Sequence, residues 1–319
     1  SDESRLKESR FHIIAVPTPN MDDAYLSCDL RYVTLAVESI LPYIKKGDVV
    51  IVESTIAPRT TQDHVLPLIE KKGLKVGRDI FLAHCPERVL PGQIIYEMIH
   101  NNRIVGGITP MCAKRAAEVY RTFVKGEIIE TEAKTAEMSK LMENTYRDVN
   151  IALANELAKI CDELHINVLD VIRMANKHPR VNLHSPGPGV GGHCLAVDPY
   201  FIYAKAPQTA KLIKIARDVN RSMPDYVVGK TEQLVGFDKR KKIAVFGVTY
   251  KPNVDDTRES PALVIADKLA QRGYRLYIHD PHVNCDDYVD FDTAIENADL
   301  LLCLVGHDVF KAMNFDKVK

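Results

Sequence analysis

The sequence lacks the features that mark several large classes of protein. Its 319 residues contain no apolar run of the roughly 18 residues that a membrane-spanning helix needs, and no signal peptide opens the chain. The formal net charge of -1 gives no support for nucleic acid or a membrane surface as a bulk partner. With 46% hydrophobic and 27% charged residues, the composition is that of an ordinary globular protein, and we expect neither nucleic acid nor membrane as a partner.

Paired cysteines are also missing. The 7 cysteines form no CxxC pair and no even set, which disfavours a disulfide framework. Two dipeptides, His84-Cys85 and His193-Cys194, come nearest to a metal site, but no further ligand follows at a metal-binding spacing. We therefore expect no metal and a reducing, cytoplasmic location.

The length predicts about two domains, and the first 130 residues alternate between strand and helix patterns. The expected strands are 12–16, 49–53, 80–84 and 103–105, and the expected helices are 31–45, 60–72 and 110–124. Short apolar strands that alternate with helices predict parallel strands in a doubly wound sheet. Ligands bind beyond the carboxyl ends of such strands, where this chain carries polar residues at 17–19, 54–55 and 85–88.

The remaining residues predict a long helix followed by a second α/β region. The long helix spans 133–164, and helices at 168–177 and 209–221 follow it, the last ending before Pro224. After Gly236 the expected elements are strands at 242–246, 275–279 and 300–305 and helices at 261–272 and 292–297. The predicted fold class is α/β, with two Rossmann-like doubly wound domains joined by a long central helix. We expect the domains to span 1–130, 131–236 and 237–319.

A glycine loop, residues 186–194, places Cys194 four residues before an aspartate, Asp198, that is expected to cap the next helix. Its four glycines are Gly187, Gly189, Gly191 and Gly192. Glycines are costly in backbone entropy, so this density indicates close approach to a ligand. Cys194 is therefore a candidate nucleophile, with a buried structural cysteine as the alternative.

The same loop matches the spelling of the dinucleotide fingerprint, G-x-G-x-x-G, at residues 187–192. That fingerprint binds phosphate only between a strand and a helix. The preceding residues 182–186 form no apolar strand, so we exclude this function for the loop.

Two further segments carry candidate polar groups. Lys140, Asn144 and Arg147 share one face of the long helix, which indicates either a solvated face or a polar site. The long connection after the strand at 242–246 offers Lys251 and Arg258 as donors for phosphate or carboxylate.

Several motifs together resemble the UDP-glucose/GDP-mannose 6-dehydrogenase family over essentially the whole chain. These motifs are VPTP (16–19), EST (53–55), CPERVLPG (85–92), SKLMEN (139–144), GVGGHC (189–194), VDP (197–199), YK (250–251) and DTRES (256–260). Their wording is most similar to the N-acetylhexosamine branch of the family. Val197 stands where many members that act on UDP-glucose carry lysine, which supports that branch.

The resemblance implies oxidation of UDP-N-acetyl-D-mannosamine at C6 to the uronate, which supplies an acidic sugar for surface polysaccharide such as a capsule. Two NAD take part, since the alcohol passes through an aldehyde to a carboxylate. The Cys194 thiolate would add to the aldehyde, and a thioester would remain for water to cleave. The resemblance further implies a homodimer through the central helix.

The resemblance also assigns site residues. The implied catalytic residues are Cys194, Lys140, Asn144, Asp198, Thr55 and Glu87. The implied NAD-binding residues are Thr18, Ser54, Thr55 and Arg258. The implied substrate-binding residues are Glu87, Arg88, Val89, Leu90, Lys140, Asn144, Arg147, Arg180, Gly189 and Lys251, of which Arg180 would reach the substrate of the neighbouring subunit.

Two departures from the family pattern lead us to expect that both terminal domains are incomplete. The glycine fingerprint and its acidic ribose-binding residue are absent, and a further family arginine would lie beyond Lys319. Three alternatives stay open. They are the same chemistry on UDP-glucose or another UDP-N-acetylhexosamine, a non-catalytic module that binds a nucleotide sugar, and a thiol hydrolase, which lacks an evident histidine with an orienting group.

Overall fold

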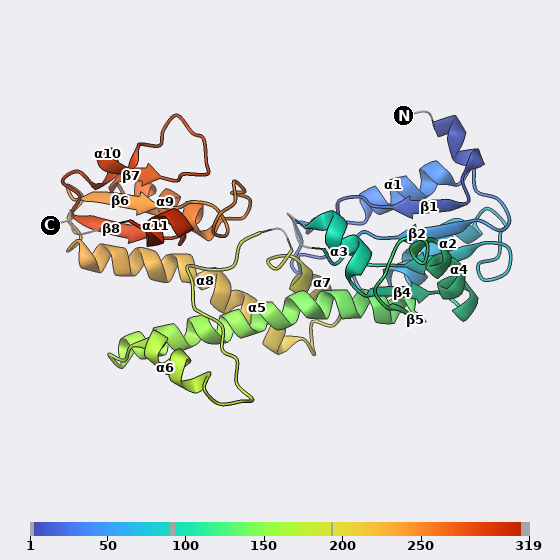
Figure 1. Cartoon of the computed structure of the whole chain (residues 1–319), viewed down its shortest axis with the longest axis horizontal. Helices are drawn as coiled ribbons and strands as arrows, with labels where there is room; N and C mark the ends of the chain where they lie inside the picture. Colours follow the sequence, from blue (N-terminus) through green and yellow to red (C-terminus); the bar gives the residue numbers. More distant parts are fainter. Residues whose placement is uncertain (1–2, 90–92, 193, 314–319) are drawn as a thin grey trace. The chain divides into compact units, whose positions relative to one another are not determined.

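The computed structural model of the chain describes residues 3–89, 93–192 and 194–313. The chain folds as two compact units (Figure 1). The first comprises Ser1–Thr145 and Val197–Lys211, and the second comprises Tyr146–Ala196 and Leu212–Lys319. Among the described residues, no helix has both the length and the apolar character needed to cross a membrane.

The first unit contains a five-stranded sheet with the order β1-β2-β3-β4-β5. Its strands are β1 (Phe11–Ile14), β2 (Val49–Val52), β3 (Phe81–His84), β4 (Arg103–Gly107) and β5 (Ile128–Glu132). Its helical elements are a 3-10 turn at Glu3–Glu8, α1 (Arg31–Ile40), a π turn at Thr61–Val65 that continues into α2 (Leu66–Glu70), α3 (Ile94–His100), α4 (Pro110–Tyr120) and α7 (Asp198–Lys205).

Helices cover both faces of this sheet, and alternate side chains of β2 pack against them. Val50 and Val52 belong to one hydrophobic cluster with residues of α1 and α2. Val49 and Ile51 belong to another with Ala116 of α4. Because successive side chains of a strand point to opposite faces, the all-apolar run 49–52 is what a strand covered on both sides requires. The doubly wound fold predicted from the sequence is confirmed here.

One strand runs against expectation. β1, β2 and β3 are parallel, but β4 pairs with β3 in the antiparallel sense and with β5 in the parallel sense. The prediction of a parallel strand near 103–105 is therefore wrong in its direction. The segment after β3 stays at the carboxyl end of the sheet, so β4 begins where β3 ends. As a result Arg103 lies beside the loop that carries Glu87.

The second unit contains a three-stranded parallel sheet with the order β7-β6-β8. Its strands are β6 (Lys242–Phe246), β7 (Arg275–His279) and β8 (Leu300–Cys303). Its helices are α6 (Val168–Ala175), α8 (Lys211–Leu234), α9 (Pro261–Gln271), α10 (Phe291–Ile295) and α11 (Asp308–Lys311). The remaining helix, α5 (Ala133–Glu163), begins in the first unit and ends in the second.

The central strand β6 is also covered on both faces. Ile243 and Val245 pack with residues of α8 and α9, whereas Phe246 packs with Phe291 and Phe310 on the other face. The chain leaves β6 first toward β7 and later returns on its other side as β8, which creates a switch point at the carboxyl end of β6. Such a point is where open α/β sheets bind ligands.

Two details of the helices differ from the sequence predictions. The helix expected to end before Pro224 is α8, which continues through Pro224 to Leu234 with that proline buried. Asp198 does not cap α7, because it is the first residue of the helix and Val197 holds the cap position without a side-chain bond. The Asp198 carboxylate accepts a hydrogen bond from Asn144 of α5.

Candidate active site

A buried polar cluster joins α5 to the start of α7 within the first unit. The Asn144 amide donates a 2.6 Å hydrogen bond to Oδ2 of Asp198, and Lys140 Nζ lies 3.7 Å from the same oxygen. Asn144 and Asp198 are buried, and only 12% of the Lys140 side chain is exposed. Lys140 and Asn144 are one helical turn apart, which lets both reach the same carboxylate. The cluster therefore combines a cation, a carboxylate and an amide of fixed orientation.

Hydroxyl groups link the carboxyl ends of β1 and β2. The Thr18 hydroxyl donates a 2.6 Å bond to the carbonyl of Thr55. The Ser54 hydroxyl accepts from the amide of Val16 at 2.7 Å and donates to its carbonyl at 2.8 Å. These bonds bring the two predicted strand ends together. They leave the Thr55 side chain partly exposed at the edge of the sheet.

Both oxygens of the Glu87 carboxylate have donors in the structure. Oε1 accepts from the backbone amides of Arg88 and Val89 at 2.6 and 3.0 Å. Oε2 lies 3.2 Å from the Arg103 guanidinium, whose side chain is almost fully buried. The Arg88 guanidinium instead pairs with Glu143 of α5 at 2.6 Å. The loop after β3 is thus fixed by its own carboxylate, while the predicted contact Leu90 lies outside the described residues.

A second layer of polar groups supports Glu87, and the sequence did not reveal it. The ring of Tyr120 lies 5.4 Å beneath the guanidinium of Arg103, and its hydroxyl donates a 2.6 Å bond to Glu53. Burial raises the pKa of the Glu53 carboxyl. Glu53 begins the EST motif, but nothing in the sequence indicates that Tyr120 would reach it from α4.

Another carboxylate missed by sequence reasoning is Glu137, on the first turns of α5. Its Oε1 accepts bonds from the amide and the hydroxyl of Thr61 at 2.8 and 2.6 Å, and its Oε2 accepts from the amide of Arg59 at 2.5 Å. Burial raises the pKa of Glu137 while these bonds oppose the shift. Glu137 thereby fixes the segment that follows Thr55.

Cys194 differs from the buried cysteines of the first unit. It is exposed and belongs to the second unit, four residues along the chain before Asp198. Burial raises the pKa of the Cys85 thiol to about 11 and that of Cys28 to about 12, so both stay protonated near neutral pH. An exposed cysteine in a glycine-dense loop is the better candidate for a reactive thiolate.

The glycines before Cys194 allow close contact with the connection between β6 and α9. A Cβ on Gly191 would lie 2.6 Å from the carbonyl oxygen of Glu259, and one on Gly189 would lie 3.0 Å from Pro261. Gly192 has a φ of +78° and donates a 3.3 Å bond to the carbonyl of Arg258. Their purpose is therefore contact between two segments of the chain, in addition to any contact with a ligand.

The basic candidates of the second unit have different surroundings. Lys251 is half-buried beside Tyr250 and follows the switch point at the end of β6. Arg258 is exposed, and its guanidinium pairs with the Asp256 carboxylate at 2.6 Å. Arg147 and Arg180 are exposed. Lys251 is therefore the basic candidate closest to the expected ligand position of this sheet.

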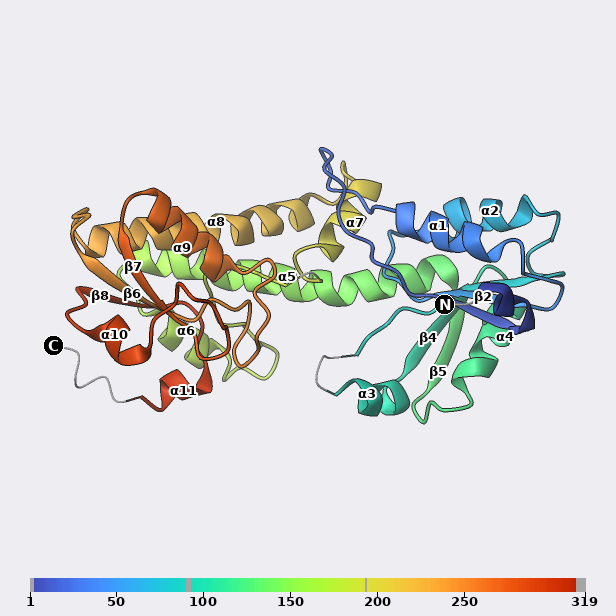
Figure 2. The same ribbon diagram turned by 90° about the horizontal axis from the view of Figure 1, so that it is seen from above.

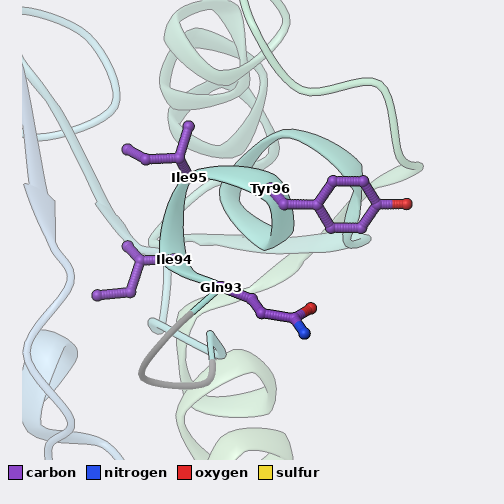
Figure 3. Close-up of a pocket in the computed structure, with 4 residues that line it drawn as sticks. All are labelled: Gln93, Ile94, Ile95 and Tyr96. Carbon is purple, nitrogen blue, oxygen red and sulfur yellow. The ribbon is translucent and has the colours of Figure 1, made fainter.

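An apolar hollow of about 590 Å³ lies at the start of α3, close to the loop that carries Glu87. It is lined by Gln93, Ile94, Ile95 and Tyr96 (Figure 3). Ile94 and Ile95 project to one side of the helix and Tyr96 to the other. The helix α3 was not predicted from the sequence.

Comparison with known proteins identifies the family. The UDP-glucose/GDP-mannose dehydrogenase family matches through its NAD binding domain (1–124), its central domain (134–222) and its UDP binding domain (244–319). The chain is 50% identical to a UDP-N-acetyl-D-mannosamine dehydrogenase of Methanocaldococcus jannaschii, over 99% of this chain and 72% of that protein. It is 43% identical to an NDP-N-acetyl-D-galactosaminuronic acid dehydrogenase of Ralstonia solanacearum, over 96% of this chain and 76% of that protein.

A solved structure of the UDP-N-acetyl-mannosamine dehydrogenase from Staphylococcus aureus is 60% identical, with a TM-score of 0.89 over 97% of this chain and 75% of that chain. These matches confirm the resemblance found in the sequence motifs. The chain therefore belongs to the UDP-glucose/GDP-mannose dehydrogenase family, and it is an NAD-dependent dehydrogenase of sugar nucleotides.

Proposed function

We propose that the protein oxidises UDP-N-acetyl-D-mannosamine at C6 to UDP-N-acetyl-D-mannosaminuronate, with two NAD per sugar. The observation that carries this proposal is the buried cluster of Lys140, Asn144 and Asp198, with Cys194 four residues before Asp198 in the chain. A cation, a general base and a thiol are the groups that a two-step oxidation of an alcohol needs. The names of the relatives support the choice of substrate.

The geometry of the cluster supports a role for each of its three residues. Lys140 stabilises negative charge that develops on the C6 oxygen, because a cation with little exposure acts in a low effective dielectric. Asp198 takes the proton of that oxygen, directly or through water. Asn144 donates to Asp198 and so fixes the carboxylate toward Lys140.

Cys194 accounts for the second oxidation. Its thiolate adds to the aldehyde carbon, and a proton moves to the aldehyde oxygen to give a thiohemiacetal. Loss of a hydride from that carbon and of the hydroxyl proton leaves a thioester. Water then adds, the carbon–sulfur bond breaks, and the thiolate leaves the carboxylate product.

Thr55 and Glu87 are the proposed handlers of that water. Thr55 offers a hydroxyl at the end of β2, and the Glu87 carboxylate is held by Arg103 and by two backbone amides. Both carboxylate oxygens act as hydrogen-bond acceptors in the structure. Glu87 therefore orients a water more readily than it removes a proton.

NAD, when bound, supplies the hydride acceptor for both oxidations. The partly buried Thr18 and Thr55 at the carboxyl ends of β1 and β2 fit the polar groups of a nicotinamide riboside. A glycine-rich pyrophosphate turn does not follow β1, where the chain continues as Pro17-Thr18-Pro19. Ser54 uses its hydroxyl to shape the strand end. Arg258 is the proposed contact from the second unit.

The UDP-sugar is proposed to bind through Lys251 at the switch point of the second sheet, where a cation meets phosphate. Gly189 gives backbone access, and Arg147 is a further donor. On the first unit the proposed contacts are Arg88, Val89 and Leu90.

A homodimer through α5 belongs to the same proposal. Large apolar side chains are exposed along one stripe of this helix at Met142, Tyr146, Leu153 and Ile160. Their spacing of four and then seven residues is that of a helix packed against another helix. Exposed apolar stripes of this kind mark interfaces. Arg180, which is exposed, is proposed to reach the substrate of the neighbouring subunit.

Two alternatives follow from specific observations. The Ralstonia solanacearum relative supports the same chemistry on another N-acetylhexosamine nucleotide, and Val197 opposes UDP-glucose. The second alternative is a non-catalytic module that binds a nucleotide sugar, and the intact set of Cys194, Lys140, Asn144 and Asp198 opposes it.

The deciding experiment measures NADH formed per sugar consumed by the full-length protein. UDP-N-acetyl-D-mannosamine, its gluco and galacto epimers and UDP-glucose are compared in parallel. Two NADH per N-acetylmannosamine, with little from the others, would support the proposal. A preference for another of these sugar nucleotides would make that compound the substrate in place of UDP-N-acetyl-D-mannosamine. Binding of a UDP-sugar without any NADH would favour the non-catalytic module.

A further inference from the structure

The start of the glycine loop is attached to α5 by one buried side chain, Asn155. Its Oδ1 accepts a 2.9 Å hydrogen bond from the amide of Gly187. Its Nδ2 donates a 2.9 Å bond to Oδ1 of Asn220 on α8. The two bonds require opposite ends of the amide group, so they fix its orientation. Asn155 is fully buried, and a buried amide is stable only when such bonds are made.

The bonds continue away from the loop into a buried ion pair. The Asn220 amide donates to the carbonyl and to Oδ1 of Asp148, at 3.0 and 2.8 Å. Asp148 also pairs with Arg217 at 2.5 Å. Burial raises the pKa of Asp148, and the charge of Arg217 opposes that shift. Within the second unit this network joins α5 to α8, which lie side by side (Figures 1 and 2). It gives Asn155 a rigid support.

Pro224 contributes to the same arrangement. A proline inside a helix cannot donate to the carbonyl four residues earlier, which here is the carbonyl of Asn220. That carbonyl oxygen faces the glycine loop, since a Cβ on Gly189 would lie 3.4 Å from it. Both the side chain and the backbone of Asn220 therefore serve the contact between α8 and the loop.

The loop is also held at its other end. Gly192 donates to the carbonyl of Arg258, and Gly191 lies too close to Glu259 for any side chain. Cys194 follows two residues after Gly192. The segment before Cys194 is thus fixed at Gly187 by the central helices and at Gly191 and Gly192 by the connection after β6.

We infer that Asn155 is a positioning residue for the thiol: by holding the amide of Gly187, it sets where Cys194 meets the substrate carbon. This inference rests on the proposed function, in which Cys194 is the nucleophile. A nucleophile displaced by about 1 Å costs on the order of 100-fold in rate, whereas binding of the nucleotide through Lys251 is not affected. Asn155 therefore acts on kcat and leaves KM unchanged.

The first test compares Asn155→Ala with a control on the same helix, Asn150→Ala. The Asn150 amide bonds only to the carbonyl of Tyr146 on its own helix among the contacts described, so its loss leaves the loop in place. We expect Asn155→Ala to lower kcat by about 10- to 100-fold with KM for the UDP-sugar changed less than about threefold. Asn150→Ala should retain the parent kcat. Equal kcat in both variants and the parent would overturn the inference.

Amide hydrogen exchange tests the attachment itself, without substrate. Residues 186 and 188 are prolines and have no amide hydrogen, so the amides of Gly187 and Gly189 dominate the signal of this short segment. Asn155→Ala should speed exchange here by at least about tenfold, as expected when a protecting bond is lost. Unchanged exchange would show that Asn155 does not hold the loop. If the parent protein makes no NADH but the exchange result holds, the proposed function fails and the attachment stands.

A third variant distinguishes positioning from a loss of packing. In Asn155→Asp a protonated carboxyl group can still accept from Gly187 and donate to Asn220, but an ionised one cannot donate. Burial disfavours the ionised form of such a group, so it should ionise at a higher pH than a carboxyl group in water. The kcat of Asn155→Asp relative to the parent should decrease from pH 6 to pH 9, while that of Asn155→Ala stays flat. Parallel profiles for the two variants would overturn the inference.

Discussion

Asp198 is the first residue of α7, and its carboxylate accepts a hydrogen bond from the Asn144 amide of α5. Lys140 lies 3.7 Å from the same oxygen. A buried carboxylate is stable only when it is paired and hydrogen-bonded, and here Asn144 and Lys140 reach it from one helical turn. The cluster therefore depends on residues that the chain brings together from positions 140–144 and 198.

Replacing Lys140 tests the electrostatic part of the proposal. Lys140→Ala should lower kcat by about 10²–10³, the loss typical of removing one donor to a developing oxyanion. Steady-state NADH formation with saturating UDP-sugar measures the effect. Lys134→Ala is the matched control, because Lys134 is on the same helix and its side chain is 48% exposed. An unchanged rate in Lys140→Ala would mean that this lysine has only a structural part.

Replacing Cys194 tests the covalent part. Cys194→Ser and Cys194→Ala should abolish the second oxidation and leave the affinity for the UDP-sugar within about threefold, since only bond formation to sulfur is lost. Calorimetric titration measures the affinity, and NADH per sugar measures the oxidation. Cys285→Ser, at another exposed cysteine of the second unit, should behave as the parent. Loss of binding in Cys194→Ala would show that the residue is structural.

Two glycines of the same loop should respond differently to alanine. In Gly191→Ala the new Cβ would lie 2.6 Å from the carbonyl oxygen of Glu259, which forces the backbone to move. In Gly187→Ala the nearest atom would lie 4.0 Å away. We expect Gly191→Ala to lower kcat by at least about tenfold, because displacement misplaces the thiol. Gly187→Ala should stay within about threefold of the parent. The reverse order would contradict the packing described here.

The stability of the protein should depend on pH through His84. Burial lowers the pKa of this imidazole from 6.5 to about 3. Between these values only the unfolded chain takes up the proton, so the free energy of unfolding falls as pH falls below 6.5. The loss from this residue is about 1.4 kcal/mol per pH unit.

Denaturant unfolding of His84→Leu between pH 6 and pH 4.5 measures that loss. The variant should show a slope against pH that is smaller than that of the parent by about 1.4 kcal/mol per unit. His100→Gln, at an exposed histidine, should keep the parent slope. Identical slopes for the parent and His84→Leu would refute the shift.

A charge on the apolar stripe of α5 should disrupt the proposed dimer. Leu153 is 52% exposed, and Leu153→Glu would place a carboxylate at the centre of the stripe. We expect light scattering after size exclusion to give a dimer for the parent and a monomer for the variant. Thr135→Glu, on an exposed position near the start of the helix, should stay dimeric. A monomeric parent would rule out this part of the proposal.

Much of the fold could be predicted because its strands are covered on both faces. The run at 49–52 is apolar throughout, and no other element of that length suits it. β5 was missed because its residues, Ile-Ile-Glu-Thr-Glu, are exposed or at most half-buried and include two glutamates. The end of α8 was placed too early, because a proline usually stops a helix and its buried environment is not visible in the sequence.

The candidate site could be predicted only in part. The shared helix face of Lys140 and Asn144 follows from their spacing, but the contact with Asp198 depends on where α7 packs. The pairing of Glu87 with Arg103 depends on the direction of β4, which was predicted wrongly. Tyr120 and Glu137 look like ordinary helix residues, and only the structure shows what their polar atoms reach.

The tight contact between the glycine loop and the connection from β6 to α9 also constrains how this protein can be engineered. A side chain on Gly191 would collide with the backbone of Glu259, and a side chain on Gly192 would press against the ring of Tyr250. Pro261 lies equally close to Gly189. The two segments are far apart in the sequence, but their surfaces are complementary in shape. A chimaera that takes one of these segments from a relative will need the other segment from the same relative as well. The two segments must therefore be exchanged together.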